Sequence, residues 1–174
     1  LVGLAGALAA LCVSDDARSL SAGLRLTAQA ACVTVGLATI GPDPAAVFAG
    51  FLPSWAAAAI VALGWMWFVN LFNFMDGIDG IAGGQAAVIG GAIGAGALIG
   101  GVPVALAAPS LAIAGAACGF LAWNWAPARV FMGDVGSAPL GFLLGWLMLQ
   151  SAAAGGAPRA RLTAERFKVR ATGA

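Results

Sequence analysis

Charged residues are rare along the chain, and they separate long uncharged stretches whose lengths predict its helices. The uncharged stretches occupy residues 1–14, 26–42, 44–75, 80–128 and 135–158. A helix that spans a bilayer needs about 20 mostly apolar residues, so the stretch over 80–128 is long enough for two. Gly100, Gly101 and Pro103 interrupt it, which predicts helices over 80–100 and 103–125 joined by a tight turn. We therefore expect an all-α, polytopic transmembrane helical bundle with about six hydrophobic segments.

The composition supports a membrane protein. Of the 174 residues, 61% are hydrophobic and 9% are charged, and the mean hydropathy is +0.97. Globular chains carry about 25% charged residues, so this chain lacks the polar surface that a water-soluble domain needs. The net charge of +1 gives no indication of a nucleic-acid partner. Glycine pairs four residues apart are typical of helices that pack closely in a bilayer, and they occur at Gly90–Gly94, Gly96–Gly100 and Gly115–Gly119.

The order of the segments places three acidic loops on one side of the membrane. If each segment crosses once, the loops over 14–23, 73–80 and 126–137 share a side. The charged residues of these loops are Asp15, Asp16, Asp76, Asp79 and Asp134, with Arg18, Arg25 and Arg129. The loop over 41–54 on the other side contains no Lys or Arg, so the positive-inside rule predicts that the acidic side faces the cytoplasm.

Five carboxylates at one end of a bundle repel one another unless cations lie between them. A hard divalent cation with oxygen ligands is the natural partner, and Mg²⁺ fits best. It takes one or two carboxylates and completes its shell with waters and substrate phosphates, which leaves the other aspartates for other roles. The nearby arginines could hold an anionic substrate.

The densest polar motif covers residues 70–80. Asn70, Asn73, Asp76 and Asp79 recur every three residues, and on a straight helix such a ridge rotates by about 60° at each step. A helix that stops near Asp76, followed by a turn through the next glycines, would let all four line one pocket. The alternative is an ordinary helix stop, because Asp-Gly is a common turn pair.

A second motif, over 124–137, carries glycines on both sides of Asp134. Glycines at a helix start let backbone amides approach a phosphate. Ser137 is expected to be the N-cap of the last helix, over 138–154, with Pro139 in its first turn. For Asp15 and Asp16 a solvated pair at the membrane surface and a functional pair both remain open.

These three motifs resemble those of a known family. Asp15-Asp16, then NLFNFMDGIDG over 70–80, then FMGDVGS over 131–137 are similar to the cytoplasmic motifs of the polyprenyl-phosphate N-acetylhexosamine-1-phosphate transferases. That family includes the phospho-MurNAc-pentapeptide transferases of peptidoglycan synthesis and the enzymes that initiate O-antigen. The similarity is greatest to the O-antigen branch, and it is carried by two segments, NFMDGIDGIAGG and AWNWAPARVFMGDVGS. The resemblance covers about residues 1–150.

The resemblance implies an activity and a place in the cell. A Mg²⁺-dependent enzyme, with Mn²⁺ as an alternative ion, would transfer the sugar 1-phosphate of a UDP-N-acetylhexosamine to undecaprenyl phosphate and release UMP. It would lie in the inner membrane of a bacterium, with its active site facing the cytoplasm, and would initiate the synthesis of an envelope polysaccharide such as O-antigen.

The resemblance also implies roles for individual residues. The catalytic set is Asp15, Asp16, Asp76 and Asp134, of which Asp134 would bind Mg²⁺ on the diphosphate and the first two would face the lipid phosphate. Asn73 and Asp76 would line the nucleotide-sugar site, and Asn124 would lie near the phosphates. The residues expected around the uracil are Gly77, Ile78, Asp79 and Phe131.

The chain also departs from the family. It contains no histidine, although the family has a histidine-bearing loop in its last cytoplasmic region, and it begins after the family's first helices. We expect a transferase core over 1–156, truncated at its N-terminus, followed by an unrelated basic tail over 157–174. We therefore interpret the chain as a fragment that is inactive by itself.

Two other classes of function remain open on the sequence alone. An ion-coupled secondary transporter would also use aspartates in Gly-rich helices, but such sites lie near the bilayer midplane, whereas these aspartates end the segments. A non-catalytic membrane scaffold is the other alternative. The sequence does not identify the sugar, the prenyl length or the oligomeric state, and it leaves a homodimer open.

Overall fold

The computed structural model describes the backbone of residues 1–18, 21–39, 48 and 51–172, and the side chains as far as Ala154 except those of 16–18. Within these residues the protein is entirely helical, as the sequence predicts. Its helices are α1 (Val2–Arg18), α2 (Ala22–Leu37), α3 (Ser54–Met75), α4 (Ile81–Leu98), η2 (Val104–Leu106, a 3₁₀ turn), α5 (Ala107–Asn124) and α6 (Gly133–Thr172).

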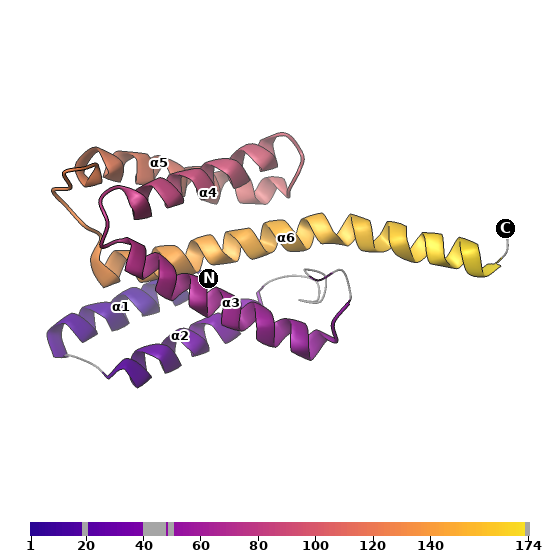
Figure 1. Cartoon of the computed structure of the whole chain (residues 1–174), viewed down its shortest axis with the longest axis horizontal. Coiled ribbons are helices and arrows are strands. Elements are labelled where there is room, and N and C mark those ends of the chain that lie inside the picture. Colours follow the sequence, from indigo (N-terminus) through magenta and orange to yellow (C-terminus); the bar gives the residue numbers. More distant parts are fainter. Residues whose placement is uncertain (19–20, 40–47, 49–50, 173–174) are drawn as a thin grey trace.

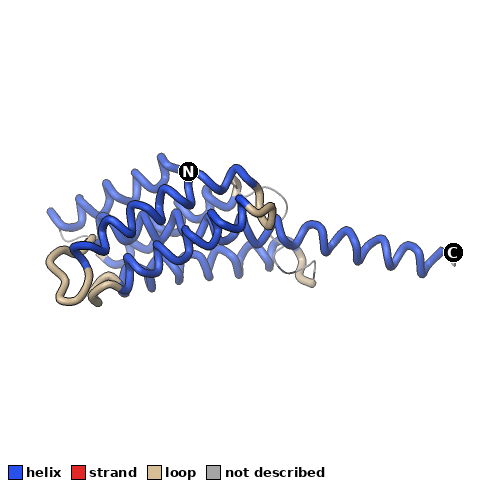
Figure 2. Tube along the Cα trace, turned by 90° about the horizontal axis from the view of Figure 1, so that it is seen from above, coloured by secondary structure: helices blue, strands red, loops and turns tan. Residues whose placement is uncertain are grey.

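The helices lie side by side, with α6 between two groups (Figure 1). The α4–α5 hairpin covers one side of α6, and α1, α2 and α3 cover the other; α6 contacts α1, α3 and α4. Seen at right angles, α6 extends well beyond the other helices toward the C-terminus (Figure 2). A 40-residue helix is about 60 Å long, twice the thickness of the hydrocarbon core.

Two apolar clusters hold this arrangement together. In the first, Trp65 of α3 stacks on Phe142 of α6 with ring centroids 4.7 Å apart, and its indole N–H donates to the Phe142 carbonyl oxygen. In the second, Phe72 of α3 is fully buried against α6 and the α4–α5 hairpin, where it meets Leu144 and Ala86. Both clusters involve α3 and α6, which makes these two helices the centre of the bundle.

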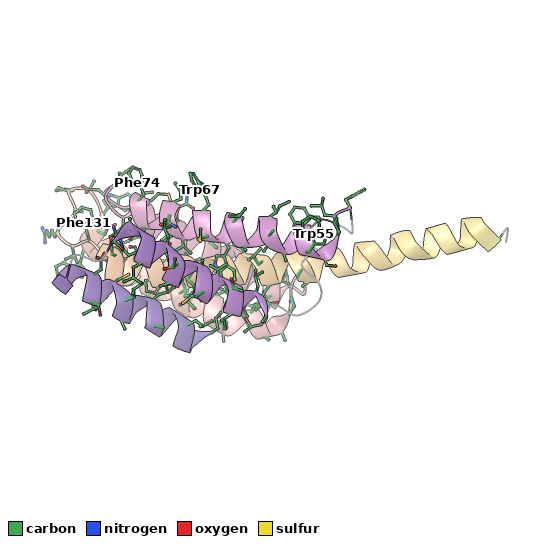
Figure 3. All side chains as sticks on the ribbon, turned by 90° about the horizontal axis from the view of Figure 1, so that it is seen from below. Trp55, Trp67, Phe74 and Phe131 are labelled. Atoms are coloured by element: carbon green, nitrogen blue, oxygen red, sulfur yellow. The ribbon has the colours of Figure 1, made fainter. Side chains whose placement is uncertain are left out.

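The lengths and compositions of the helices confirm a polytopic helical membrane bundle. Four segments are long and apolar enough to span a bilayer: Ser54–Met75, Ile81–Leu98, Val104–Asn124 and Gly133–Ala154. Val2–Asp15 and Ala22–Leu37 are shorter apolar helices. Most of each spanning segment lies outside the core, and large apolar side chains point outward along the bundle, among them Trp55, Trp67 and Phe74 (Figure 3). This surface suits lipid as the solvent.

Close packing of the α4–α5 hairpin depends on one of the predicted glycine pairs. A Cβ added to Gly90 would lie 2.6 Å from the Ser110 carbonyl oxygen, and one added to Gly94 would lie 2.6 Å from the Leu111 side chain. The prediction is therefore confirmed for Gly90–Gly94. Added Cβ atoms at Gly115 and Gly119 would meet nothing within 4 Å, so the Gly115–Gly119 pair makes no close helix contact within the described residues.

Two predicted boundaries are wrong. Helix α1 continues to Arg18, so Asp15 lies in its last turns and not in a loop. Helix α6 begins at Gly133, which has a φ of 64°, and not at residue 138. Ser137 is therefore not an N-cap. It lies inside α6, fully buried, and its hydroxyl donates to the Gly133 carbonyl oxygen one turn earlier at 2.8 Å.

The three junctions that carry the acidic motifs lie at one end of the bundle, as the crossing order predicts. The end of α1, the start of α2 and the α3–α4 and α5–α6 connections all lie at the left in Figure 1, and the α4–α5 turn lies at the opposite end. The loop predicted over 41–54 lies mostly outside the described residues. The backbone of α6 continues through residue 156 without a break, and the division into a core and a tail stays a prediction.

Candidate functional site

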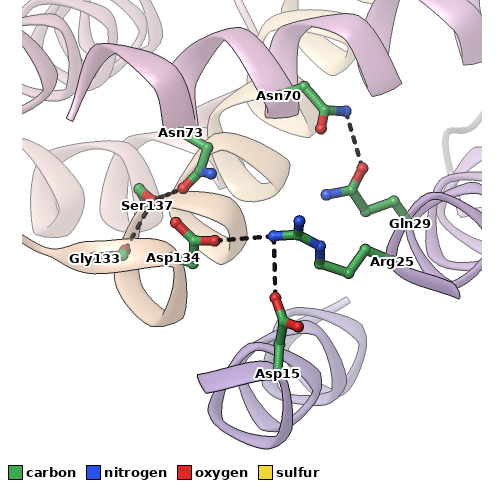
Figure 4. A network of polar contacts seen from close by, with 8 residues as sticks. All are labelled: Asp15, Arg25, Gln29, Asn70, Asn73, Gly133, Asp134 and Ser137. Carbon is green, nitrogen blue, oxygen red and sulfur yellow. Dashed lines mark hydrogen bonds and ion pairs between the residues drawn. The ribbon is translucent and has the colours of Figure 1, made fainter. Parts of the chain in front are cut away.

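An arginine joins two of the predicted aspartates at the acidic end of the bundle (Figure 4). Nη1 of Arg25 lies 3.0 Å from Oδ2 of Asp15 and 3.4 Å from Oδ2 of Asp134. These residues come from α2, α1 and α6, so one guanidinium connects three helices. The Asp15 side chain is 11% exposed, whereas those of Arg25 and Asp134 are 42% and 40% exposed. The contact with Asp134 is therefore open to solvent and to ligands.

Neutral side chains continue this polar group toward α3. The Ser137 hydroxyl forms a hydrogen bond with Oδ1 of Asn73, which ties α6 to α3. Nδ2 of Asn70 donates to Oε1 of Gln29 at 2.9 Å, which ties α3 to α2. The polar network of Figure 4 thus draws its members from four helices.

A cavity of about 380 Å³ opens beside this network. Arg25, Gln29, Asn70, Asn73 and Asp134 give it a polar side. Its other walls are mostly apolar, from Leu8, Leu11, Cys12, Ala22, Leu26, Phe74 and Ala138. A site of this kind suits a ligand with an anionic group attached to an apolar body, because both parts find matching surfaces.

Asp76 has a different position from that predicted. It is only 5% exposed, and its carboxylate accepts hydrogen bonds from the backbone N–H groups of Gly133, at 2.8 Å, and Met132, at 3.3 Å. These groups belong to the start of α6, where a negative charge also interacts favourably with the helix dipole. The sequence predicted that glycines near Asp134 leave amides for a phosphate. The amides of Met132 and Gly133 are instead bound by Asp76.

Asn124 and Asp79 tie the same two loops together. Asn124 is fully buried; its Oδ1 accepts from the Gly80 N–H at 3.0 Å, and its Nδ2 donates to the Val130 carbonyl oxygen at 2.8 Å. Oδ2 of Asp79 accepts from the Ala128 N–H at 3.0 Å. Gly80 has a φ of 73°, a conformation that favours glycine at this junction. Together with Asp76, these side chains form an interloop latch between 76–80 and 124–133.

The predicted site residues therefore fall into three groups. Asp15, Asn73 and Asp134 belong to the polar network; Asp76, Asp79 and Asn124 form the latch; Gly77, Ile78 and Phe131 are exposed on the two loops. The side chain of Asp16 lies outside the described residues. Of the four polar residues of the 70–80 motif, Asn70 and Asn73 line this cavity, whereas the carboxylates of Asp76 and Asp79 accept hydrogen bonds from the 128–133 segment.

Sequence reasoning missed the contacts of Arg25 and Gln29. Both line the cavity, and they are four residues apart on α2. That spacing places two side chains on the same face of a helix and could have indicated a shared site.

The donor set is compatible with a magnesium ion bound to few protein ligands. No group of three or more His, Cys, Asp or Glu residues close enough to hold a metal occurs in the described part of the chain. Mg²⁺ does not require one, because it retains waters and binds substrate phosphates beside one or two carboxylates. Asp15 and Asp134 supply such a pair, and the cation that bridges them here is the Arg25 guanidinium.

The fold and this site define a class: a multi-pass helical membrane protein whose acidic and polar motifs meet at one end of the bundle. More particularly, the chain belongs to glycosyl transferase family 4, whose family model matches residues 1–152.

Curated relatives of this chain carry the name phospho-N-acetylmuramoyl-pentapeptide-transferase. The chain is 38% identical to the one from Mycobacteroides abscessus over an alignment of 120 positions, which covers 60% of this chain and 31% of that protein. It is 39% identical to the one from Shouchella clausii over an alignment of 117 positions, which covers 64% of this chain and 35% of that protein. The chain thus spans about a third of the length of these relatives. No solved structure matches it significantly.

Proposed function

We propose that the protein transfers the sugar 1-phosphate of a UDP-N-acetylhexosamine to undecaprenyl phosphate and releases UMP, with Mg²⁺ or Mn²⁺ bound at Asp134. Membership of glycosyl transferase family 4 supports a transferase. The single observation that carries the proposal is the meeting of Asp15, Arg25 and Asp134 beside a cavity with one polar and one apolar side. A lipid phosphate and a nucleotide diphosphate both need charged groups of this kind beside the surface that binds them.

The reaction is a phosphoryl transfer. An oxygen of the lipid phosphate forms a bond to the β-phosphorus of the UDP-sugar, the bond from that phosphorus to the bridging oxygen breaks, and UMP leaves with the electron pair. A phosphate monoester has a second pKa near 6, so about 90% of the acceptor is already dianionic at pH 7. The acceptor therefore has little need of a general base, and the protein's task is to position two anions against each other.

Different residues would contribute to the positioning of the two anions. Asp134 would hold the metal, which neutralises charge on the diphosphate when bound. Arg25 carries a positive charge on the cavity wall, where it can orient a phosphate with two parallel hydrogen bonds. The interloop latch fixes the start of α6 and with it Asp134. The apolar walls of the cavity suit the first part of a prenyl chain.

Two donors are candidates. The sequences of the motifs over 73–84 and 122–137 favour the O-antigen branch, and hence a simple UDP-N-acetylhexosamine such as UDP-GlcNAc. The names of the curated relatives favour UDP-N-acetylmuramoyl-pentapeptide. Both donors share the UDP and the N-acetylhexosamine 1-phosphate, so the proposed chemistry is the same. We also propose a bacterial inner-membrane location with the acidic end in the cytoplasm; a homodimer is compatible with this and stays open.

The proposal is tested by product formation in lipid nanodiscs. The 174-residue chain and the longest protein that its gene encodes are each supplied with Mg²⁺, undecaprenyl phosphate and either donor. We expect a lipid-linked sugar diphosphate that requires both substrates, disappears with EDTA and returns with excess Mg²⁺. Absence of this product from both preparations with both donors would contradict the proposal.

A further inference from the structure

Arg25 lies between two carboxylates of the acidic end. One nitrogen atom, Nη1, contacts Oδ2 of Asp15 and Oδ2 of Asp134, so both oxygens are directed at a single cationic centre (Figure 4). The contact with Asp134 is the longer of the two, at 3.4 Å, and both of its side chains are about two-fifths exposed. The bridge is therefore weak at Asp134, the residue at which the proposed function places the metal.

Charge balance favours exchange at this pair. Two carboxylates and one guanidinium leave a net charge of −1, whereas a divalent cation neutralises the carboxylates completely. Mg²⁺ also approaches oxygen ligands to about 2.1 Å, much closer than a guanidinium nitrogen can. Once both carboxylates bind a divalent ion, they no longer attract Arg25, and the ion repels it.

A displaced Arg25 side chain would lie in the neighbouring cavity. Arg25 already lines the 380 Å³ cavity, and Gln29, Asn70 and Asn73 line the same polar side. These residues offer hydrogen-bonding groups, and the mouth of the cavity is open to solvent. A guanidinium released there presents its donors to whatever anion the cavity holds.

We propose that Arg25 and a divalent cation bind the Asp15–Asp134 pair in alternation. Without metal, Arg25 holds α1, α2 and α6 together and prevents the two carboxylates from repelling each other. When the metal binds, it displaces Arg25 from Asp134 and frees the guanidinium for an anion in the cavity. Arg25 is thus both a competitor of the metal and a positioning residue. The inference rests on the proposed function only in placing the metal at Asp134.

Equilibrium binding of Mn²⁺, followed by the electron paramagnetic resonance of the free ion, tests this without any turnover. Arg25→Gln removes the competing charge and leaves both carboxylates. We expect it to bind Mn²⁺ about five- to tenfold more tightly than the unaltered protein, a size set by the partial exposure of the ion pairs. Arg25→Lys keeps the charge but loses the broad guanidinium, and we expect a smaller increase.

Two further variants locate the effect. Arg129→Gln removes an exposed cation from the same end of the molecule, outside the contact pair, and its Mn²⁺ affinity should stay within twofold. Asp134→Asn should abolish the Mn²⁺ site, both alone and combined with Arg25→Gln. Retention of the site in Asp134→Asn would contradict the proposal.

The remaining outcomes separate the two claims. If the unaltered protein binds Mn²⁺ and folded Arg25→Gln binds it equally or more weakly, the alternation is wrong and the proposed function is untouched. If Arg25→Gln fails to fold, Arg25→Lys decides, and an affinity no higher than that of the unaltered protein contradicts the alternation. If no Asp134-dependent Mn²⁺ site exists in any preparation, the metal role in the proposed function fails as well.

Discussion

The aspartates of the acidic end differ in what their carboxylates contact, and this determines what each can do. Asp15 and Asp134 face a cation beside an open cavity, whereas Asp76 is buried against backbone N–H groups. The sequence identified Asp76 and Asp134 as functional candidates through their glycine-rich motifs, and the resemblance to the family added Asp15. It could not assign their partners, since Asp76 lies 57 residues from Gly133 along the chain.

At Asp134, replacement by Asn should remove metal binding while keeping the size of the side chain. We expect turnover to fall by about 10² to 10³, the usual loss when one electrostatic contact to the transition state is removed. Binding of the UDP-sugar should fall less, because other groups also hold it. Rates of product formation and donor affinity at saturating Mg²⁺ measure the two effects. Activity within tenfold of the unaltered protein would remove Asp134 from the metal role.

At Asp76, replacement by Asn should destabilise the start of α6. The amide has one acceptor oxygen and no charge, so one of the two partly buried N–H groups loses its partner, at a cost of about 1 kcal/mol. Asp79→Asn is the matched control, because Asp79 is exposed and accepts one hydrogen bond. Unfolding in a detergent series compares the two variants. Equal stabilities for both would contradict the role of Asp76 in fixing α6.

At the level of helices, the lengths of the uncharged stretches predicted which segments are helical, but not where α6 begins. The α4 and α5 helices begin and end within a few residues of the prediction, because glycine and proline mark the turn between them. The start of α6 is stabilised by Asp76, a residue of another helix. No local signal near Gly133 records that contact, so Ser137 was the nearest plausible N-cap.

The hairpin of α4 and α5 offers a direct test of its packing. Gly90→Ala would place a methyl group 2.6 Å from the Ser110 carbonyl oxygen, and backbone cannot move aside cheaply. We expect a loss of about 1–3 kcal/mol in the free energy of unfolding. Gly91→Ala is the control, because its added Cβ would meet nothing within 4 Å. If Gly90→Ala is as stable as Gly91→Ala, the close contact between the helices is not as described.

At the level of the whole molecule, the order of the helices brings three distant motifs to one end. The crossing order predicted this correctly, because consecutive helices run in opposite directions along the bundle. The sequence could not show that the end divides into a cavity and a latch. That division depends on side-chain contacts between residues up to 109 positions apart.

The positive-inside rule predicts the orientation of the bundle in the membrane, and labelling tests this prediction. In a background without native cysteines, Ala128→Cys lies on the α5–α6 loop and Val104→Cys on the opposite α4–α5 turn. In intact cells an impermeant thiol reagent should label Val104→Cys and not Ala128→Cys. After permeabilisation both should react. Labelling of Ala128→Cys from outside the cell would contradict the predicted orientation.

The identity of the released nucleotide tests the central claim most directly. Transfer of a sugar 1-phosphate breaks the bond from the β-phosphorus of the donor to the bridging oxygen and releases UMP, whereas transfer of the sugar alone releases UDP. We predict UMP in equal amount to the lipid-linked product, dependent on the Asp134 carboxylate, in nanodiscs with undecaprenyl phosphate and Mg²⁺. Release of UDP in place of UMP, or UMP release unchanged by Asp134→Asn, would contradict the account.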